Sequence, residues 1–373
     1  MAFGEAAARQ TDMARRQDTI LSRYRAGDRS RLALLMIAAL IVVAIFSLLF
    51  SVTTGASDAS FVDVIRSVAM GKADGVLSTR DRIIILDIRM PRATLGFLIG
   101  ASLAVSGAIM QGLFRNPLAD PGLVGVSSGA SFGAVVMIVL GNGIAAPLYN
   151  GLGIYALPLA AFTGGLVTTL LLYRIATRNG QTSVATMLLA GIALGAMTMA
   201  LTGVLIYMAD DRQLRDLTFW GMGSLSGATW IKIAAAGPII LLSLVAMPFM
   251  ARGLNAITLG EAAAFHMGIP VQRLKTIAIV TVAGATGASV AVSGGIGFVG
   301  IVVPHLLRMV IGPDHRYLLP ASALLGGSLL IFADVLARTL VVPAELPIGI
   351  ITASVGGPFF LWILLRQRSR LSL

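Results

Sequence analysis

Long apolar runs constrain the fold of this chain more than any other feature. A membrane-spanning helix needs about twenty mostly apolar residues, because the hydrocarbon core is about 30 Å thick. Runs of this kind cover residues 32–52, 93–113, 122–141, 154–174, 184–208, 231–250, 276–292, 295–312, 317–337 and 347–365. The third and eighth runs give the weakest signal because they contain glycine and proline. We therefore expect an all-α, polytopic membrane protein with about ten transmembrane helices.

The composition agrees with this expectation. Of the 373 residues, 57% are hydrophobic and only 12% are charged, about half the charged fraction of ordinary soluble domains. Cysteine is absent, which excludes disulfides, thiol nucleophiles and zinc–thiolate sites. The net charge of +11 could suit nucleic acid or anionic lipid. Membrane topology gives a simpler explanation, so no nucleic-acid partner is expected.

Both ends of the chain are basic. Residues 1–31 form a polar, arginine-rich tail, and the C-terminal sequence includes Arg366, Arg368 and Arg370. Cytoplasmic segments carry the excess of basic residues, so both termini are predicted to be cytoplasmic. The first apolar run is too long for a signal-peptide core, and residues 32–373 are read as the transmembrane domain. Binding of the tail to anionic lipid is the alternative role for its arginines.

Two polar connections are long enough to have a role of their own. Residues 53–91 are predicted to form an external segment between the first two spans. Residues 251–275 form a cytoplasmic segment, in which helix-forming residues flank Gly260 and in which Gly268 and Pro270 end the second stretch. This pattern predicts two short amphipathic helices over 254–270, lying at the cytoplasmic surface.

Recognisable catalytic motifs are missing. The sequence has no G-x-x-x-x-G-K-[ST] phosphate-binding loop and no H-E-x-x-H zinc motif, and its three histidines lie far apart. We therefore predict no enzyme activity, no metal site and no cofactor bound by this chain. Acidic residues are scarce within the apolar runs, which weighs against an ion-coupled secondary transporter without excluding it.

One apolar run is unusually rich in helix-weakening residues. Ser293 to His305 reads Ser-Gly-Gly-Ile-Gly-Phe-Val-Gly-Ile-Val-Val-Pro-His. A lipid-facing helix does not need four glycines, a proline and a histidine, so this block should pack against protein. It predicts a close turn near the external side, between the seventh and eighth spans. His305 is read as a structural histidine and not as a heme ligand.

Several motifs, in order along the chain, resemble the permease subunits of ABC importers for iron–siderophore, heme and cobalamin, the FecCD/BtuC-like family. The resemblance covers about residue 60 to the C-terminus and rests on the ordered set of blocks. These are Arg89-Met-Pro-Arg92, Gly107 to Pro121 with its Asn116-Pro-Leu-Ala-Asp, Leu189-Ala-Gly191, Leu254-Asn255 through Leu259-Gly260-Glu261, the glycine block with Pro304-His305 and Arg308, Asp314-His315-Arg316, and Glu345-Leu-Pro347-Ile-Gly349 with Gly357-Pro358.

The resemblance implies a BtuC-like permease of a type II ABC importer in the bacterial inner membrane. Such permeases form homodimers and work with two cytoplasmic ATPase subunits, which use ATP and Mg, and with one periplasmic binding protein. Loop details in 210–224 and 337–345 look closest to the heme branch. Heme is therefore the expected substrate, and a ferric siderophore or cobalamin is the alternative.

The resemblance also implies roles for particular residues. Docking of the binding protein is expected at Arg89, Arg92 and Arg338, for which interfacial snorkelling is the plainer alternative. Coupling to the ATPase is expected in 254–270, through Asn255, Leu259, Gly260, Glu261 and Gly268, with a passive surface loop as the alternative. A cytoplasmic gate is expected at Asn116, Leu118, Thr182 and Ser183, although the first pair also suits an ordinary turn.

Overall fold

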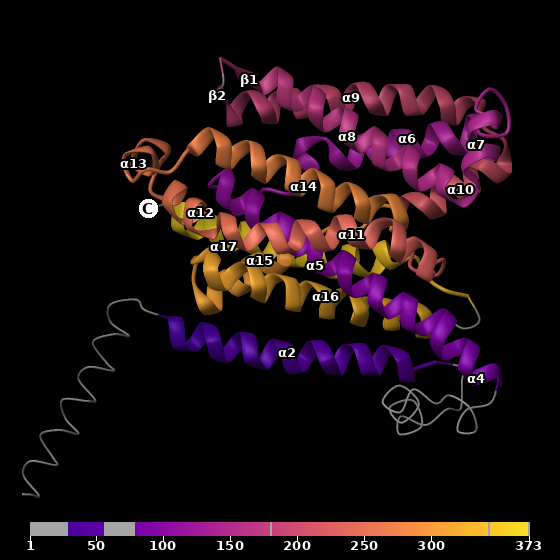
Figure 1. Ribbon diagram of the computed structural model, residues 1–373, viewed down its shortest axis with the longest axis horizontal. Coiled ribbons are helices and arrows are strands. Elements are labelled where there is room, and N and C mark those ends of the chain that lie inside the picture. The colour runs from indigo at the N-terminus through magenta and orange to yellow at the C-terminus, as the bar shows by residue number, and fades with distance from the viewer. Residues whose placement is uncertain (1–28, 56–78, 180, 342–343, 372–373) are drawn as a thin grey trace, which may run out of the picture.

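The computed structural model describes residues 29–55, 79–179, 181–341 and 344–371, and within these ranges the chain is a bundle of helices (Figure 1). Most of the predicted tail and the middle of the predicted external segment lie outside the described residues. Among the described residues, seven helical stretches are long and apolar enough to cross a membrane, and three shorter apolar helices accompany them. The expectation of about ten membrane helices is confirmed.

The two ends of the bundle carry different elements. The short helices α12 (Ala251–Thr258) and α13 (Glu261–His266) lie at one end, together with a two-stranded hairpin. Helices α4 (Thr79–Ile83), α7 (Ala146–Leu152) and α10 (Asp211–Gly221) lie at the other (Figure 1). These are called the α13 end and the α10 end below. Helix α2 (Ser30–Thr53) runs from the α13 end to the α10 end along the outside of the bundle.

A single long helix forms the centre. It begins with α4, continues through a π-helical turn, η1 (Ile84–Arg89), and ends as α5 (Met90–Leu113). Helix α5 is buried along most of its length against α14, α15 and α16. Glycine permits these close approaches: a Cβ on Gly100 would overlap the backbone of Gly326, and one on Gly107 would overlap that of Gly300.

The second group of helices packs on one side of this core. The 3-10 turn η2 (Pro121–Val124) leads into α6 (Val126–Leu140), and α7 and the turn η3 (Gly153–Tyr155) lead into α8 (Ala156–Ala176). The antiparallel strands β1 (Thr177–Arg178) and β2 (Gln181–Thr182) join α8 to α9 (Val184–Met208). Helix α6 begins four residues later than expected, because Gly125 adopts a left-handed conformation.

The third group returns to the core. It contains α11 (Trp230–Ala246), the turn η4 (Met247–Met250), α12, α13 and α14 (Val271–Ser293). The predicted pair of short helices is present, but α12 directly continues the α11–η4 stretch and buries Leu254 and Ile257. Only α13 lies wholly beyond the spans. The two helices of the predicted pair therefore differ, because the apolar face of α12 packs into the core.

The glycine block makes the predicted turn. Gly294 has a φ of +73°, and Ser224 donates its N–H to the Ser293 carbonyl oxygen at 2.8 Å. Helix α15 (Val299–Ile311) begins only where Gly300 meets Gly107, so the eighth span starts later and is shorter than expected. Helices α16 (His315–Thr339) and α17 (Ile348–Leu371) complete the bundle.

Candidate functional sites

The three predicted docking arginines meet at the α10 end. Arg92, at the start of α5, donates from Nε to both carboxylate oxygens of Asp334 at 3.0 Å and from Nη1 to Glu345 at 2.9 Å. Arg89 donates to the Val52 carbonyl oxygen at 3.0 Å. Arg338 donates to carbonyl oxygens of α2 and of the residue after it, and its Nε lies 3.7 Å from Asp334. The three arginines that the sequence analysis assigns to docking thus lie close together.

This arginine cluster points inward. Arg89 and Arg92 are buried and Arg338 is nearly buried, while the Glu345 side chain is 40% exposed. The cluster joins the end of α2, the start of α5, the end of α16 and the connection to α17. Sequence reasoning missed Asp334 and Glu345 as partners, although an acidic residue inside an apolar span is a signal of a buried partner.

The five predicted coupling residues do not share one surface. Leu259 is 71% exposed, while Asn255 points inward and joins α12 to the start of α16. Its Nδ2 donates to Asp314 at 2.6 Å, and its Oδ1 accepts from the His315 N–H at 2.9 Å. Asn255 therefore holds α12 in place within the chain.

The Asp314 carboxylate caps the first turn of α16. Partial burial works against its charge, but hydrogen bonds from Arg316 and Asn255, together with the Arg316 charge, lower the pKa of Asp314 to about 2. It therefore remains ionised across physiological pH. This keeps the junction between α12 and α16 charged and hydrogen-bonded.

Helix α13 lies between two glycines with positive φ, +111° at Gly260 and +79° at Gly268. Phe265 and Met267 are both more than half exposed and, with Leu259, form an apolar surface at the α13 end. The first residue of α13, Glu261, forms an ion pair with Lys275 of α14 at 2.7 Å. Sequence reasoning missed Phe265, Met267 and Lys275, and the signal for Lys275 is a lysine within an otherwise apolar helix.

The four predicted gate residues lie in two separate turns. In the turn after α5, the Leu118 N–H donates to Oδ1 of Asn116 at 3.0 Å, so this is an Asx-type turn. Ser183 caps α9, where its Oγ accepts from the Thr186 N–H. Thr182 is buried, and both its N–H and its carbonyl oxygen are bonded to side chains of α14.

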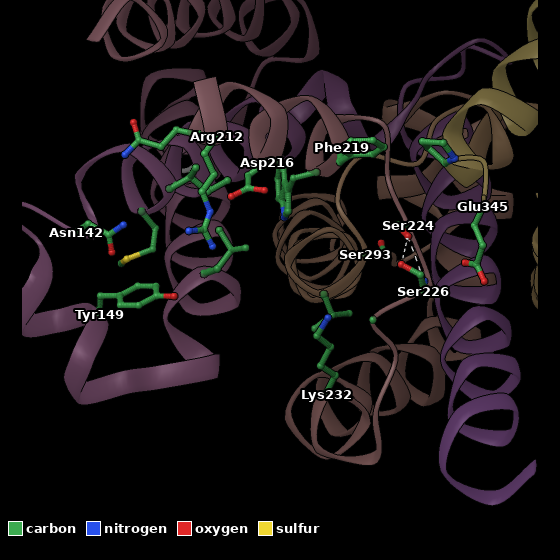
Figure 2. A pocket seen from close by; sticks show the side chains of 18 of the residues that line it. Asn142, Tyr149, Arg212, Asp216, Phe219, Ser224, Ser226, Lys232, Ser293 and Glu345 are labelled. Carbon is green, nitrogen blue, oxygen red and sulfur yellow. Dashed lines mark hydrogen bonds between the residues drawn. The ribbon is translucent and has the colours of Figure 1, made fainter. Parts of the chain in front are cut away.

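A pocket of about 790 Å³ opens at the α10 end, between α10 and the start of α11. Figure 2 shows Arg212, Asp216 and Phe219 from α10 on one side and Lys232 from α11 on another, with Ser224, Ser293 and Glu345 close to one another. Glu345 belongs both to this pocket and to the arginine cluster. No group of three potential metal ligands occurs within the part of the chain that the structure describes.

Comparison with known proteins agrees with this arrangement. A sequence model of the FecCD transport family matches residues 40–366. The hemin transport permease HmuU of Yersinia pestis is 48% identical over 77% of this chain and 84% of its own length. The cobalamin import permease BtuC of Halobacterium salinarum is 44% identical over 76% of this chain and 73% of its own length.

A solved structure shows the same fold. It is described as the inward-facing conformation of a metal-chelate-type ABC transporter, with a TM-score of 0.76 and 29% identity. The alignment covers 88% of this chain and 98% of the other. The chain therefore belongs to the FecCD transport family, as a multi-pass membrane permease subunit of an ABC importer that relies on a separate ATPase and a binding protein.

Proposed function

We propose that this permease forms a homodimer that moves heme from a periplasmic binding protein into the cytoplasm, driven by two cytoplasmic ATPase subunits. The observation that carries the choice of heme is the 48% identity to a hemin permease over 287 residues, compared with 42–44% to cobalamin permeases. A ferric siderophore or cobalamin is the alternative substrate. ATP and Mg belong to the ATPase partner.

The α13 end is proposed to face the cytoplasm of a bacterial inner membrane. The start of α2, which follows the basic tail, and the C-terminus both lie at this end (Figure 1). Basic flanking segments favour the cytoplasmic side, so both termini are cytoplasmic in this arrangement. The α10 end, with the arginine cluster and the large pocket, then faces the periplasm.

The pocket at the α10 end is proposed to receive the substrate first. Phe219, Trp220 and Tyr149 supply flat apolar surfaces suited to a macrocycle. Lys232 and Arg212 offer cations for the two carboxylates that heme carries. The lining includes residues of the 210–224 segment, whose loop details look closest to the heme branch in the sequence analysis.

Docking of the binding protein at Arg89, Arg92 and Arg338 is proposed to proceed by exchange of partners. In the free permease these guanidinium groups are bound internally, and Glu345 is the most exposed of their carboxylate partners. An acidic side chain of the binding protein would compete with Glu345 for Arg92. Arg92 and Arg338 lie against Asp334, whereas Arg89 is held by carbonyl oxygens at the end of α2.

The α13 end is proposed to contact the ATPase. The apolar surface formed by Leu259, Phe265 and Met267 is exposed beside α13, and the glycines on either side allow this helix to move as a unit. The turns at Asn116–Leu118 and Thr182–Ser183 are proposed as the cytoplasmic gate. Their motion would open the path when the ATPase closes on ATP.

Reconstitution tests the whole proposal. The permease is placed in proteoliposomes with its candidate ATPase and binding protein, and uptake of heme, a ferric siderophore and cobalamin is measured with and without ATP. ATP-dependent heme uptake that needs all three proteins is the expected result. Uptake driven by an ion gradient without the ATPase would instead establish a secondary transporter, and exclusive uptake of another chelate would replace heme as the substrate.

The docking step has its own test. Reversing both charges with Arg89→Glu and Arg92→Glu should abolish binding of the binding protein, because the periplasmic cluster would then repel acidic partners. The exposed pair Arg80 and Arg82, changed in the same way, is the matched control. Retained dimer assembly, checked by size-exclusion chromatography, separates loss of docking from loss of folding, and unchanged docking would rule out the role.

A further inference from the structure

Lys275 connects two elements that the proposed function treats separately, the coupling helix and the gate. It is the fifth residue of α14 and is only 2% exposed. Its Nζ lies 2.7 and 2.8 Å from the two carboxylate oxygens of Glu261, the first residue of α13. The same ammonium group donates to the Thr182 carbonyl oxygen at 2.9 Å.

A second α14 side chain completes the attachment of the hairpin. The Oε1 atom of Gln272, one turn before Lys275 on the helix, accepts from the Thr182 N–H at 2.9 Å. Both backbone polar groups of Thr182 are thus bound by side chains at positions i and i+3 of α14, which lie on one helix face. The hairpin of β1 and β2 therefore follows the first turn of α14 as a unit.

The two contacts of Lys275 differ in burial. Thr182 is buried, whereas Glu261 is 39% exposed and stands directly after Gly260, whose left-handed backbone is the hinge of α13. A buried ammonium without a carboxylate is strongly unfavourable, so the ion pair resists separation. When a partner displaces α13, the pair pulls on Lys275, and through it on Thr182.

We propose that Lys275 is a positioning residue that transmits the displacement of α13 to the hairpin at 177–182, so that the gate responds to the ATPase. The inference rests on the proposed function, since it gives that function a physical link between its coupling helix and its gate. The link requires one cation that reaches a carboxylate on α13 and a carbonyl oxygen on the hairpin at the same time.

The test compares three variants in the full complex of permease, ATPase and binding protein. Lys275→Met removes the cation and keeps the apolar length of the side chain, whereas Lys275→Arg keeps the charge and several donors. Arg273→Met, on an exposed position two residues away, is the matched control. The readout is the number of heme molecules imported per ATP hydrolysed, together with the hydrolysis rate itself.

We expect the complex with Lys275→Met to assemble and to hydrolyse ATP, but to import at least about fivefold less heme per ATP. A fivefold change corresponds to the lower end of typical coupling free energies. Lys275→Arg should recover most of the ratio, and the control should match the original protein. An unchanged ratio in Lys275→Met would overturn the inference. Parallel loss of assembly and hydrolysis in both lysine variants would also overturn it, because the residue would then be structural only.

A distance measurement makes the test independent of the substrate. The chain contains no cysteine, so cysteines introduced at the exposed positions Arg178 and Arg252 can carry paired spin labels in the full complex. ATP should change the distance between the hairpin and α12, and Lys275→Met should remove the change. An identical change in Lys275→Met would contradict the link, whereas a failure of the unaltered complex to import heme would count against the proposed function alone.

Discussion

Two buried ion-pair clusters stand at opposite ends of the bundle, and they are built differently. At the α10 end, Arg92 is bound to Asp334 and Glu345, and four segments of the chain meet around it. At the α13 end, Lys275 has one carboxylate partner, which stands on a short helix between two left-handed glycines. The first arrangement joins long helices to one another, while the second joins a short helix to a long one. In the proposed mechanism, the first buried charge therefore holds a junction in place and the second transmits the displacement of α13.

Removing the carboxylate at the centre of the arginine cluster should have the largest effect on stability. Asp334→Ala leaves Arg92 and Arg338 buried without their shared partner, and breaking such a pair costs about 3–5 kcal/mol. Thermal unfolding in detergent should show a clearly lower midpoint. The control is Asp87→Ala, at an exposed position of η1. Equal unfolding midpoints for Asp334→Ala and Asp87→Ala would show that the arginine cluster does not hold the junction together.

Changing the hinge of α13 should have an intermediate effect. At Gly260, φ is +111° and ψ is 150°, a region open essentially to glycine, and an added Cβ would meet no neighbour. Gly260→Ala therefore adds only backbone strain, about 1–3 kcal/mol. Gly195→Ala in the middle of α9 also meets no neighbour, but its helical backbone tolerates alanine. Unfolding in detergent should separate these two variants, and similar stability would show that α13 needs no special hinge.

Neutralising the exposed partner of Arg92 should have the smallest effect on stability. The Glu345 side chain is 40% exposed, and ion pairs with an exposed partner contribute up to about 1 kcal/mol to stability. Glu345→Gln should nevertheless strengthen docking of the binding protein by up to about fivefold, since it removes the competitor for Arg92. Titration of the binding protein onto the permease in nanodiscs measures this change. Weaker docking would show that Glu345 is itself part of the docking surface.

The helices that the sequence predicted well are those in which local signals agree. The span at 184–208 was predicted with the bounds of α9, because Ser183 caps a run that continues without interruption to the polar residues 210–212. Helix α15 was predicted too long, because its start depends on the contact of Gly300 with α5 and on Phe298, whose φ is +68°. Neither the Gly300 contact nor the Phe298 conformation can be read from the length of the apolar run.

The residues of the candidate sites were easier to select than their partners. Arg92 was chosen from its motif, but its partners are 242 and 253 residues away along the chain. Asn255 and Glu261 were expected to cap a helix or to contact the ATPase, and both have strong contacts within the chain that the sequence did not predict. Local pattern indicates that a polar residue near a span needs a partner, while only the three-dimensional packing decides which one.

The separation of Arg92 from its carboxylates also affects how the protein is made. A ribosome adds about 5–20 residues per second, so Asp334 and Glu345, which lie 242 and 253 residues further along, are synthesised roughly 10–50 seconds after Arg92. During that interval the arginine at the head of α5 has no carboxylate of its own cluster. The junction at the α10 end is therefore completed late, and a nascent chain that stops before α16 would present an unpaired arginine to quality-control proteases.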